Sequence, residues 1–172
     1  MGKRAVITGM GVVSPAGIGK EENWESLLQG KSGIDRFSRL DPSHLPVSVG
    51  AEVKNFNPKK FIKDRKAVRL SFFNVHLALA AAELAVGDSE IEIEKVDPTR
   101  FGAIVGSGGG GFDDGPGFED LNEPILKAWD EENQRFDSSK FGEEGVPVAH
   151  PLFLLKALPN NAFYYISLFY NI

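Results

Sequence analysis

Short apolar runs and helical stripes alternate along the first part of the chain. Residues 5–8 (AVIT) form a β-branched run that ends at glycines, and this pattern predicts a buried strand. Residues 21–28 begin with acidic residues, place Trp24, Leu27 and Leu28 on one face and precede Gly30, which predicts a helix. A strand followed by a helix favours an α/β fold.

The most apolar helical pattern covers residues 64–86. One of its two apolar stripes consists of Val68, Phe72, Val75, Leu79 and Ala82. Because this helix is apolar on nearly all sides, we expect it to be buried between two layers and to end at Gly87.

Further elements are predicted in the second half of the chain. Residues 101–105 (FGAIV) predict a second buried strand, and seven glycines follow between residues 106 and 117. A helix carrying Ile125, Leu126 and Trp129 is predicted after Pro124, and two helical pieces are predicted at residues 151–157 and 159–169. We interpret residues 1–172 as one domain with an insertion-like segment at about 34–60, in which a strand is predicted at 47–53.

Two glycine-rich turns invite a phosphate-binding interpretation. Gly9 and Gly11 follow a predicted strand, but the third glycine of a dinucleotide fingerprint is missing and no acidic ribose ligand follows at the right distance. A Rossmann-type nucleotide-binding protein is therefore the less favoured alternative. The loop at residues 106–111 lacks a following Lys-Ser or Lys-Thr, and Asp113 and Asp114 would repel an anion, so a P-loop is excluded.

Composition removes several classes of function. The net charge of −5 over 172 residues gives no electrostatic footprint for nucleic acid or for an anionic membrane, and no apolar run is long enough to span one. We expect a cytoplasmic protein. The chain has no Cys, so it has neither a disulfide nor a thiol nucleophile, and its three histidines lack metal-binding spacing. No metal and no cofactor are expected, and His76 is predicted to be a packed, hydrogen-bonded core residue.

The order of these pieces resembles a known family. Residues 5–17 (AVITGMGVVSPAG) are very similar to the opening strand and turn of β-ketoacyl-acyl-carrier-protein synthases of the fatty acid and polyketide type. Four further segments resemble that family's SGI motif, alanine-rich helix, glycine-rich strand and loop, and P-N helix start, namely residues 32–34, 65–85, 101–111 and 158–160. Residues 161–165 are bulkier than is usual in the family, which points to a divergent subgroup or a chain-length-factor relative.

The resemblance implies the first half only of an α/β, thiolase-like fold. In that fold two related halves pack as αβαβα layers, each with a mixed sheet and layered helices, and the protein usually dimerises through the final strand of the first half. The complete family transfers an acyl group to a cysteine and condenses it with malonyl-acyl carrier protein by decarboxylation. The family's cysteine, histidine pair and lysine have no counterpart among residues 1–172, so no catalytic residue is expected here and the chain alone is predicted to be inactive.

Two sets of site residues follow from the resemblance. Gly108 and Gly109 correspond to the substrate pocket that holds the acyl chain, and Asn160, Phe163 and Tyr164 correspond to the dimer interface. The implied partners are acyl carrier protein and either a second copy or a complementary carboxy-terminal half. The alternative is a non-catalytic, chain-length-factor-like or scaffold subunit of a ketosynthase.

Overall fold

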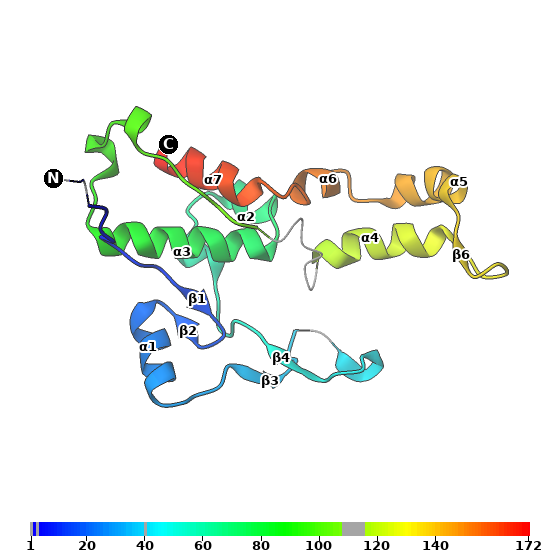
Figure 1. Ribbon diagram of the computed structural model, residues 1–172. Helices are drawn as coiled ribbons and strands as arrows, with labels where there is room; N and C mark the ends of the chain where they lie inside the picture. Colours follow the sequence, from blue (N-terminus) through cyan, green and yellow to red (C-terminus); the bar gives the residue numbers. More distant parts are fainter. Residues whose placement is uncertain (1, 3, 40, 108–115) are drawn as a thin grey trace.

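A computed structural model describes residues 2, 4–39, 41–107 and 116–172 of the chain (Figure 1). Its α-helices are α1 (Lys20–Leu28), α2 (Arg65–Arg69), α3 (Phe73–Ser89), α4 (Pro116–Lys127), α5 (Ser138–Lys140), α6 (Phe153–Lys156) and α7 (Asn161–Tyr170). Short 3₁₀ helices lie at η1 (Pro42–His44), η2 (Pro58–Lys60), η3 (Ile93–Lys95), η4 (Pro98–Arg100) and η6 (Val146–Val148), and η5 (Phe141–Gly145) is a π-helical turn.

The described strands form three antiparallel pairs. β1 (Val13–Ser14) pairs with β2 (Gly17–Ile18), β3 (Ile34–Arg36) with β4 (Val49–Ala51), and β5 (Trp129–Asp130) with β6 (Arg135–Phe136). β4 confirms part of the strand predicted at residues 47–53. In Figure 1, α3 and α7 lie side by side, α4 to α6 extend from them as an arm, and α1 with β1 to β4 forms a lobe on the other side of α3.

The hydrophobic core lies where η2, α2, α3 and α7 meet. Its buried members are Ile62, Ala67, Val75, Leu79, Ala162 and Tyr165. The ring of buried Phe72 lies 6.1 Å from that of Phe153, which connects α6 to this core. On the other side of α3, the Phe56 ring meets the Phe73 ring edge-on at 5.4 Å, which attaches the lobe.

The predicted helix at residues 64–86 is confirmed in content but not in its bounds. Asp64 caps the start of α2, where its carboxylate accepts hydrogen bonds from the backbone N–H groups of Lys66 and Ala67. The helix then breaks before α3, because Ser71 Oγ donates to the Ala67 carbonyl and Phe72 is extended. Gly87 stays helical, and the left-handed residue that ends α3 is Glu90, with φ of 54°.

Both predicted buried strands are wrong. Residues 5–8 and 101–105 belong to no strand in the described structure, and Val6, Ile7 and Ile104 are almost fully exposed. Residues 101–105 still alternate, with Phe101, Ala103 and Val105 half-buried, as a strand with one covered face would. A strand is defined by ladder hydrogen bonds to a neighbour, and the described part of the chain places no neighbour beside either segment.

Gly9 and Gly11 allow the extended chain that includes residues 5–8 to pack closely against α3. This chain is the first extended segment. A Cβ on Gly9 would lie 2.5 Å from the Ser89 nitrogen, and one on Gly11 would lie 2.5 Å from the Ala85 nitrogen. Only glycine allows the two backbones to approach this closely.

Helix α1 matches its predicted span, but its apolar face is exposed to solvent and its polar face is buried. Trp24, Leu27 and Leu28 share one face as predicted, and that face is exposed, whereas the buried residues of α1 are Asn23 and Ser26. Gly30 follows the helix with φ of +63°, as expected for the residue beyond its end.

The predicted helix after Pro124 begins earlier than expected. Pro116 is the first residue of α4, the position that proline favours, and Pro124 lies buried inside the helix. Trp129 is not part of the helix but belongs to β5. The helical pieces predicted at residues 151–157 and 159–169 correspond to α6 and α7. None of the described helices is long and apolar enough to cross a membrane.

Candidate functional site

The end of the α6–α7 connection and the first turn of α7 carry the three residues that the resemblance assigns to a dimer interface. Asn160 precedes α7 and is exposed, while the next residue, Asn161, is buried. The Asn161 amide nitrogen donates to the carbonyl oxygens of Leu155 and Lys156 at 2.8 and 3.0 Å, and thereby satisfies the end of α6. Sequence reasoning named Asn160 and missed Asn161, because two adjacent asparagines give no signal of which one points inward.

Phe163 and Tyr164 lie on the exposed side of α7, and Tyr165 lies on the buried side. The Tyr164 and Tyr165 rings are 5.0 Å apart in an edge-on arrangement, so packing against the core fixes the direction of Tyr164. The structure therefore brings Asn160, Phe163 and Tyr164 onto one turn of chain with their side chains accessible, which an interface requires. Gly108 and Gly109, assigned to the substrate pocket, lie outside the described residues.

His76 and His150 have structural roles. His76 is buried on α3, and its Nε2 lies 3.0 Å from the Val68 carbonyl oxygen, so Nε2–H donates. Burial lowers the pKa of His76, because its charged form would lose hydration. The prediction of a hydrogen-bonded core histidine is confirmed. His150 Nδ1 accepts from the Leu152 backbone N–H at 3.1 Å in the loop before α6.

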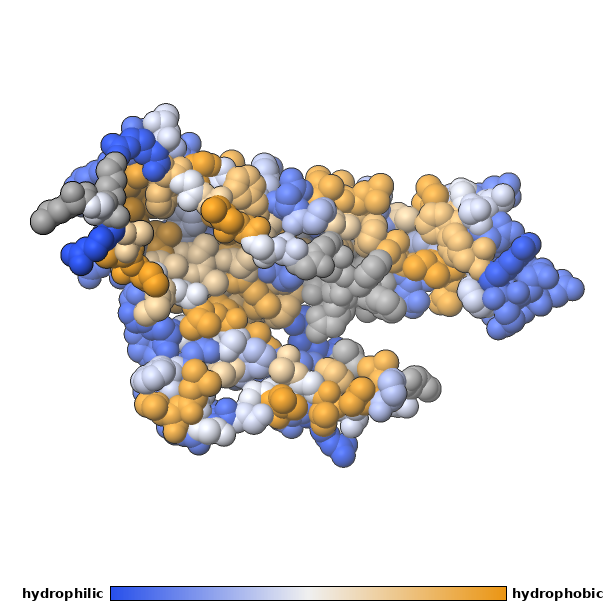
Figure 2. Space-filling view, in the orientation of Figure 1, coloured by the Kyte–Doolittle hydropathy of each residue, from blue (hydrophilic) through white to orange (hydrophobic). Residues whose placement is uncertain are grey.

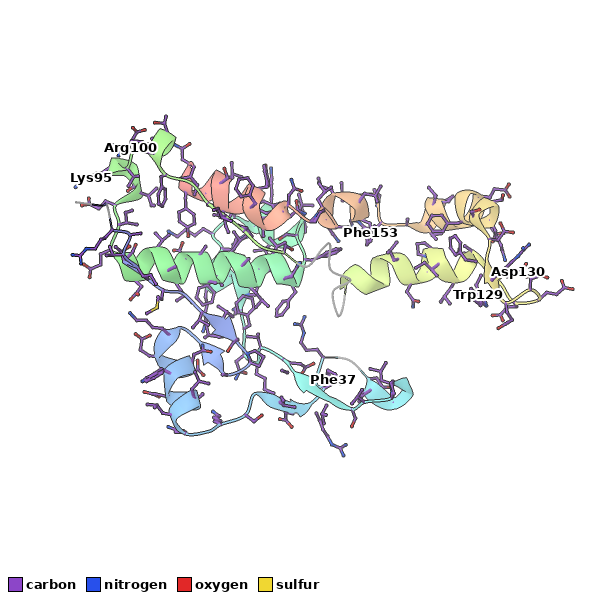
Figure 3. All side chains as sticks on the ribbon, in the orientation of Figure 1. Phe37, Lys95, Arg100, Trp129, Asp130 and Phe153 are labelled. Atoms are coloured by element: carbon purple, nitrogen blue, oxygen red, sulfur yellow. The ribbon has the colours of Figure 1, made fainter. Side chains whose placement is uncertain are left out.

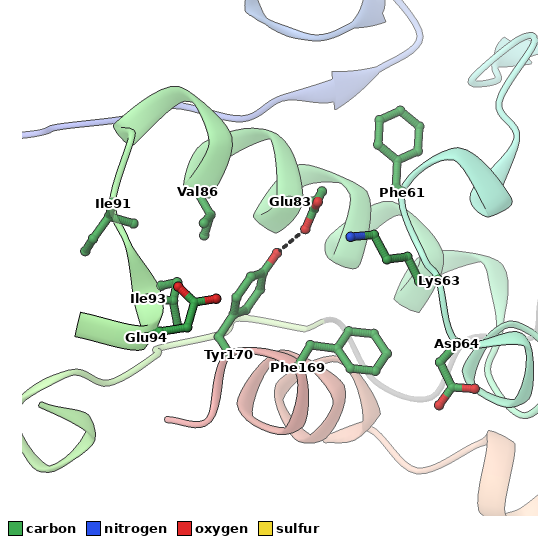
Figure 4. A pocket seen from close by; sticks show the side chains of 10 residues that line it. All are labelled: Phe61, Lys63, Asp64, Glu83, Val86, Ile91, Ile93, Glu94, Phe169 and Tyr170. Atoms are coloured by element: carbon green, nitrogen blue, oxygen red, sulfur yellow. Dashed lines mark hydrogen bonds between the residues drawn. The ribbon is translucent and has the colours of Figure 1, made fainter. Parts of the chain in front are cut away.

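A pocket of about 450 Å³ opens between α3, η3 and α7 (Figure 4). Tyr170 OH donates to Glu83 Oε2 at 2.8 Å across it. Burial, together with this bond to a carboxylate, raises the pKa of Tyr170, so the phenol stays protonated at neutral pH. The raised pKa means that Tyr170 is not an activated nucleophile. No group of three His, Asp or Glu side chains suited to a metal occurs among the described residues.

Asp88, near the end of α3, fixes the amino-terminal segment. Its Oδ2 accepts from the Met10 backbone N–H at 2.9 Å, and its Oδ1 pairs with Lys20 Nζ. The hydrogen bond from Lys20 lowers the pKa of Asp88, which therefore stays ionised. Sequence reasoning did not single out this residue, because its two partners are 68 and 78 positions away in the chain.

The arm extends far from the central helices. Figure 3 places Trp129 and Asp130 at its tip, and Lys95 and Arg100 at the opposite end of the molecule. Asp130 Oδ1 accepts from the backbone N–H groups of Glu132 and Asn133, each at 3.1 Å, and so closes the β5–β6 turn. These described side chains therefore stabilise the backbone or lie at the surface. The sequence has no Cys, so it has no thiol that could accept an acyl group.

Comparison with known proteins identifies the family to which this chain is similar. Residues 3–143 match the family described as "Beta-ketoacyl synthase, N-terminal domain". The chain is 41% identical over 110 residues to 3-oxoacyl-[acyl-carrier-protein] synthase 2 of Coxiella burnetii, covering 64% of this chain and 26% of that protein. It is 43% identical over 110 residues to the tetracenomycin polyketide synthase ketoacyl synthase beta subunit of Streptomyces glaucescens, covering 64% of this chain and 27% of that protein.

Solved structures agree on the fold. The ishigamide ketosynthase/chain length factor matches 97% of this chain with a TM-score of 0.68 and 23% identity, and a β-ketoacyl synthase from Burkholderia phymatum matches 97% with a TM-score of 0.66 and 23% identity. The matched parts are 37% and 36% of those chains. This chain thus spans about a quarter of the curated relatives and somewhat more than a third of the solved ones. The chain belongs to the β-ketoacyl synthase family and carries residues of its amino-terminal domain.

Proposed function

We propose that this chain supplies the amino-terminal half of a β-ketoacyl synthase and that condensation requires a complementary carboxy-terminal half. In the proposed reaction an acyl group passes from the thiol of its carrier to a cysteine thiolate of the second half, with release of the carrier thiol. Malonyl-acyl carrier protein then loses CO₂, and the resulting carbon nucleophile attacks the carbonyl carbon of the acyl-cysteine; the new carbon–carbon bond forms as the carbon–sulfur bond breaks and the cysteine thiolate leaves. The chain itself has no Cys and is inactive alone.

One quantity supports this proposal above all others. The chain exposes 12414 Å², whereas a compact monomer of 18.8 kDa exposes roughly 8,300 Å². The excess of about 4,100 Å² is larger than one side of a standard interface, at about 800 Å² per partner, and fits an obligate contact. Figure 2 shows apolar side chains at the surface of the central helices, the arm and the lobe. A second body of comparable size would cover this surface.

The finer architecture belongs to the same proposal. Residues 5–8 and 101–105 become strands of a mixed sheet when neighbouring strands are supplied, in αβαβα layers. The exposure of all of residues 5–8, the alternating exposure of residues 101–105, and the tight contact of Gly9 and Gly11 with α3 support this view. Residues 1–172 then form an incomplete amino-terminal domain with an insertion-like segment at about 34–60, and Gly108 and Gly109 line the acyl pocket. A cytoplasmic location is part of the proposal.

Acyl carrier protein is the proposed second partner. A solved type II polyketide ketosynthase that shares this fold is bound to its acyl-carrier protein. In this chain, exposed cations gather around η2 and α2, namely Lys59, Lys60, Lys63, Arg65, Lys66 and Arg69. Such a basic surface favours an acidic partner by charge complementarity. The net charge of −5 for the whole chain does not reveal this local basic cluster.

A complementation assay tests the proposal. The purified chain is mixed with the carboxy-terminal part of the Coxiella burnetii relative, beginning after the position that corresponds to the last residue of this chain. CO₂ release from malonyl-acyl carrier protein and formation of the 3-oxoacyl product are then measured. We expect activity from the mixture and none from either part alone. A stable complex without product would contradict the proposal.

A non-catalytic subunit is the second candidate, and one observation favours it. The chain is as similar to the ketoacyl synthase beta subunit of Streptomyces glaucescens as to the synthases. In this case Asn160, Phe163 and Tyr164 would contact an intact ketosynthase, or a second copy of the chain. The double variant Phe163→Ala/Tyr164→Ala would then abolish co-purification with the intact ketosynthase, while Leu154→Ala, an exposed control on α6, would not.

A further inference from the structure

Helix α1 presents an apolar face that is held outward by its own buried side. Trp24, Leu27 and Leu28 are spaced i, i+3 and i+4 and are 62–68% exposed. This spacing is the one that a helix uses to pack against another helix. Helix α1 belongs to the lobe, with β1 and β2 between it and α3 (Figure 1).

The buried side of α1 is polar and fully bonded. The Asn23 amide nitrogen donates to the carbonyl oxygens of Gly17 and Gly19 at 2.7 and 2.8 Å, and the Asn23 side-chain oxygen accepts from Ser14 Oγ. Ser26 Oγ donates to the Ala16 carbonyl oxygen at 2.7 Å. The apolar face cannot turn inward without breaking these bonds and burying unpaired polar groups, so α1 is built to expose it.

The charges beside the face indicate which partner fits. Glu21 and Glu25 follow one edge of the apolar stripe, while the cation of Lys20 is paired with Asp88. An antiparallel pair of α1 helices related by a two-fold axis would bring these acidic edges together, which disfavours a second copy. A helix whose apolar stripe is bordered by Lys or Arg would satisfy both the stripe and the acidic edge.

We propose that the face formed by Trp24, Leu27 and Leu28 docks an amphipathic helix with a basic border, and that the complementary carboxy-terminal half carries this helix. The inference rests on the proposed function for the identity of the partner. The relatives extend well beyond the part that matches this chain, so a body large enough to carry such a helix accompanies the domain in those proteins.

The test uses Trp24 as its own reporter. Trp129→Phe leaves Trp24 as the single tryptophan, and the carboxy-terminal part of the Coxiella burnetii relative is the probe. We expect a blue shift of Trp24 emission on binding. The double variant Leu27→Glu/Leu28→Glu should weaken binding at least tenfold, and Glu25→Lys should weaken it and reduce its dependence on salt. Ser139→Glu places a negative charge at an exposed polar residue of the arm and should bind as the parent does.

Four outcomes would overturn the inference: no binding, binding that leaves Trp24 emission unchanged, equal affinity of the double variant and the parent, or self-association of the chain through this face. Condensation activity, measured separately, distinguishes the two proposals. Activity that is restored equally in the double variant would remove the docking face and leave the proposed function. A shielded Trp24 without condensation would support the docking face and contradict the proposed function.

Discussion

Helices α3 and α7 and the extended residues 5–8 and 101–105 are all apolar in sequence, yet of these segments only the helices contribute fully buried side chains. Leu79 and Tyr165 belong to the buried core, whereas Ile7 and Ile104 are exposed. A helix satisfies its backbone hydrogen bonds within the segment, and it needs a neighbour only for its side chains. A strand needs a neighbour for both, so in this chain the helices fold against one another while the extended segments stay unpaired.

This difference is the one expected if the chain is part of a layered fold, as proposed above. The chain at Gly11 contacts α3 closely, and in the proposed assembly this contact would cover one face of the sheet. In the proposed assembly, the complementary carboxy-terminal half would cover the opposite face and supply the ladder hydrogen bonds. Stability should therefore reside in the helical core, while the extended segments should respond to a partner.

The largest expected effect is in the core. Leu79→Ala should lower the free energy of unfolding by about 2–5 kcal/mol, because Leu79 is buried between α3 and α7 and a cavity would remain. Urea unfolding followed by circular dichroism measures the loss. Leu154→Ala makes the same change at an exposed position and should alter the free energy by no more than about 0.5 kcal/mol. Equal losses in the two variants would show that the core is not where the structure places it.

The next effect lies at the contact between the two regions. In Gly11→Ala the new Cβ would meet the Ala81 carbonyl oxygen and lie 2.5 Å from the Ala85 nitrogen, so the extended segment must move off α3. We expect a loss of about 1–3 kcal/mol in the free energy of unfolding. Gly102→Ala is the matched control, because a Cβ there meets no atom within 4 Å. A neutral Gly11→Ala would mean that the first segment does not pack against α3.

The same contrast explains how much of the fold could be predicted from the sequence. The helical elements at residues 64–86, 151–157 and 159–169 are present because their apolar period and caps are local signals. Their bounds moved where a local competitor acted, as when Ser71 Oγ takes the Ala67 carbonyl. The strand predictions rested on equally apolar runs, but pairing is set by distant chain that a local pattern cannot reveal.

The candidate site, too, was only partly predictable from the sequence. Asn160, Phe163 and Tyr164, which the resemblance assigns to the dimer interface, are exposed, and their role in an interface stays a prediction. The sequence motifs did not reveal Asn161, whose role depends on the carbonyl groups at the end of α6, or Asp88, whose partners are far away in sequence. The sequence also did not reveal that the apolar face of α1 is exposed to solvent. Asn23 and Ser26 look like surface residues until the turn at residues 14–19 offers them hydrogen-bond partners.

A smaller effect should follow pH through the core. Burial lowers the pKa of His76, so the unfolded chain binds a proton more readily than the folded chain. The stability contributed by neutral His76 is therefore complete above the ordinary histidine pKa of about 6.5 and is lost as pH falls below it. We expect a lower free energy of unfolding at pH 5.5 than at pH 7.5. His76→Gln can still donate to the Val68 carbonyl oxygen, and it should reduce that difference; an unchanged difference would assign the pH dependence to other groups.

The smallest expected effect is the most informative about the extended segments. Ile104→Thr should change the free energy of unfolding of the chain alone by less than about 0.5 kcal/mol, because the Ile104 side chain is fully exposed. Val75→Thr, a polar change at a buried position, should destabilise it clearly. When the carboxy-terminal half is added, Ile104→Thr should weaken the complex, since a buried isoleucine contributes about 1.5–3 kcal/mol. A complex of unchanged affinity would mean that residues 101–105 stay exposed after assembly, and the second layer would then have to cover another face.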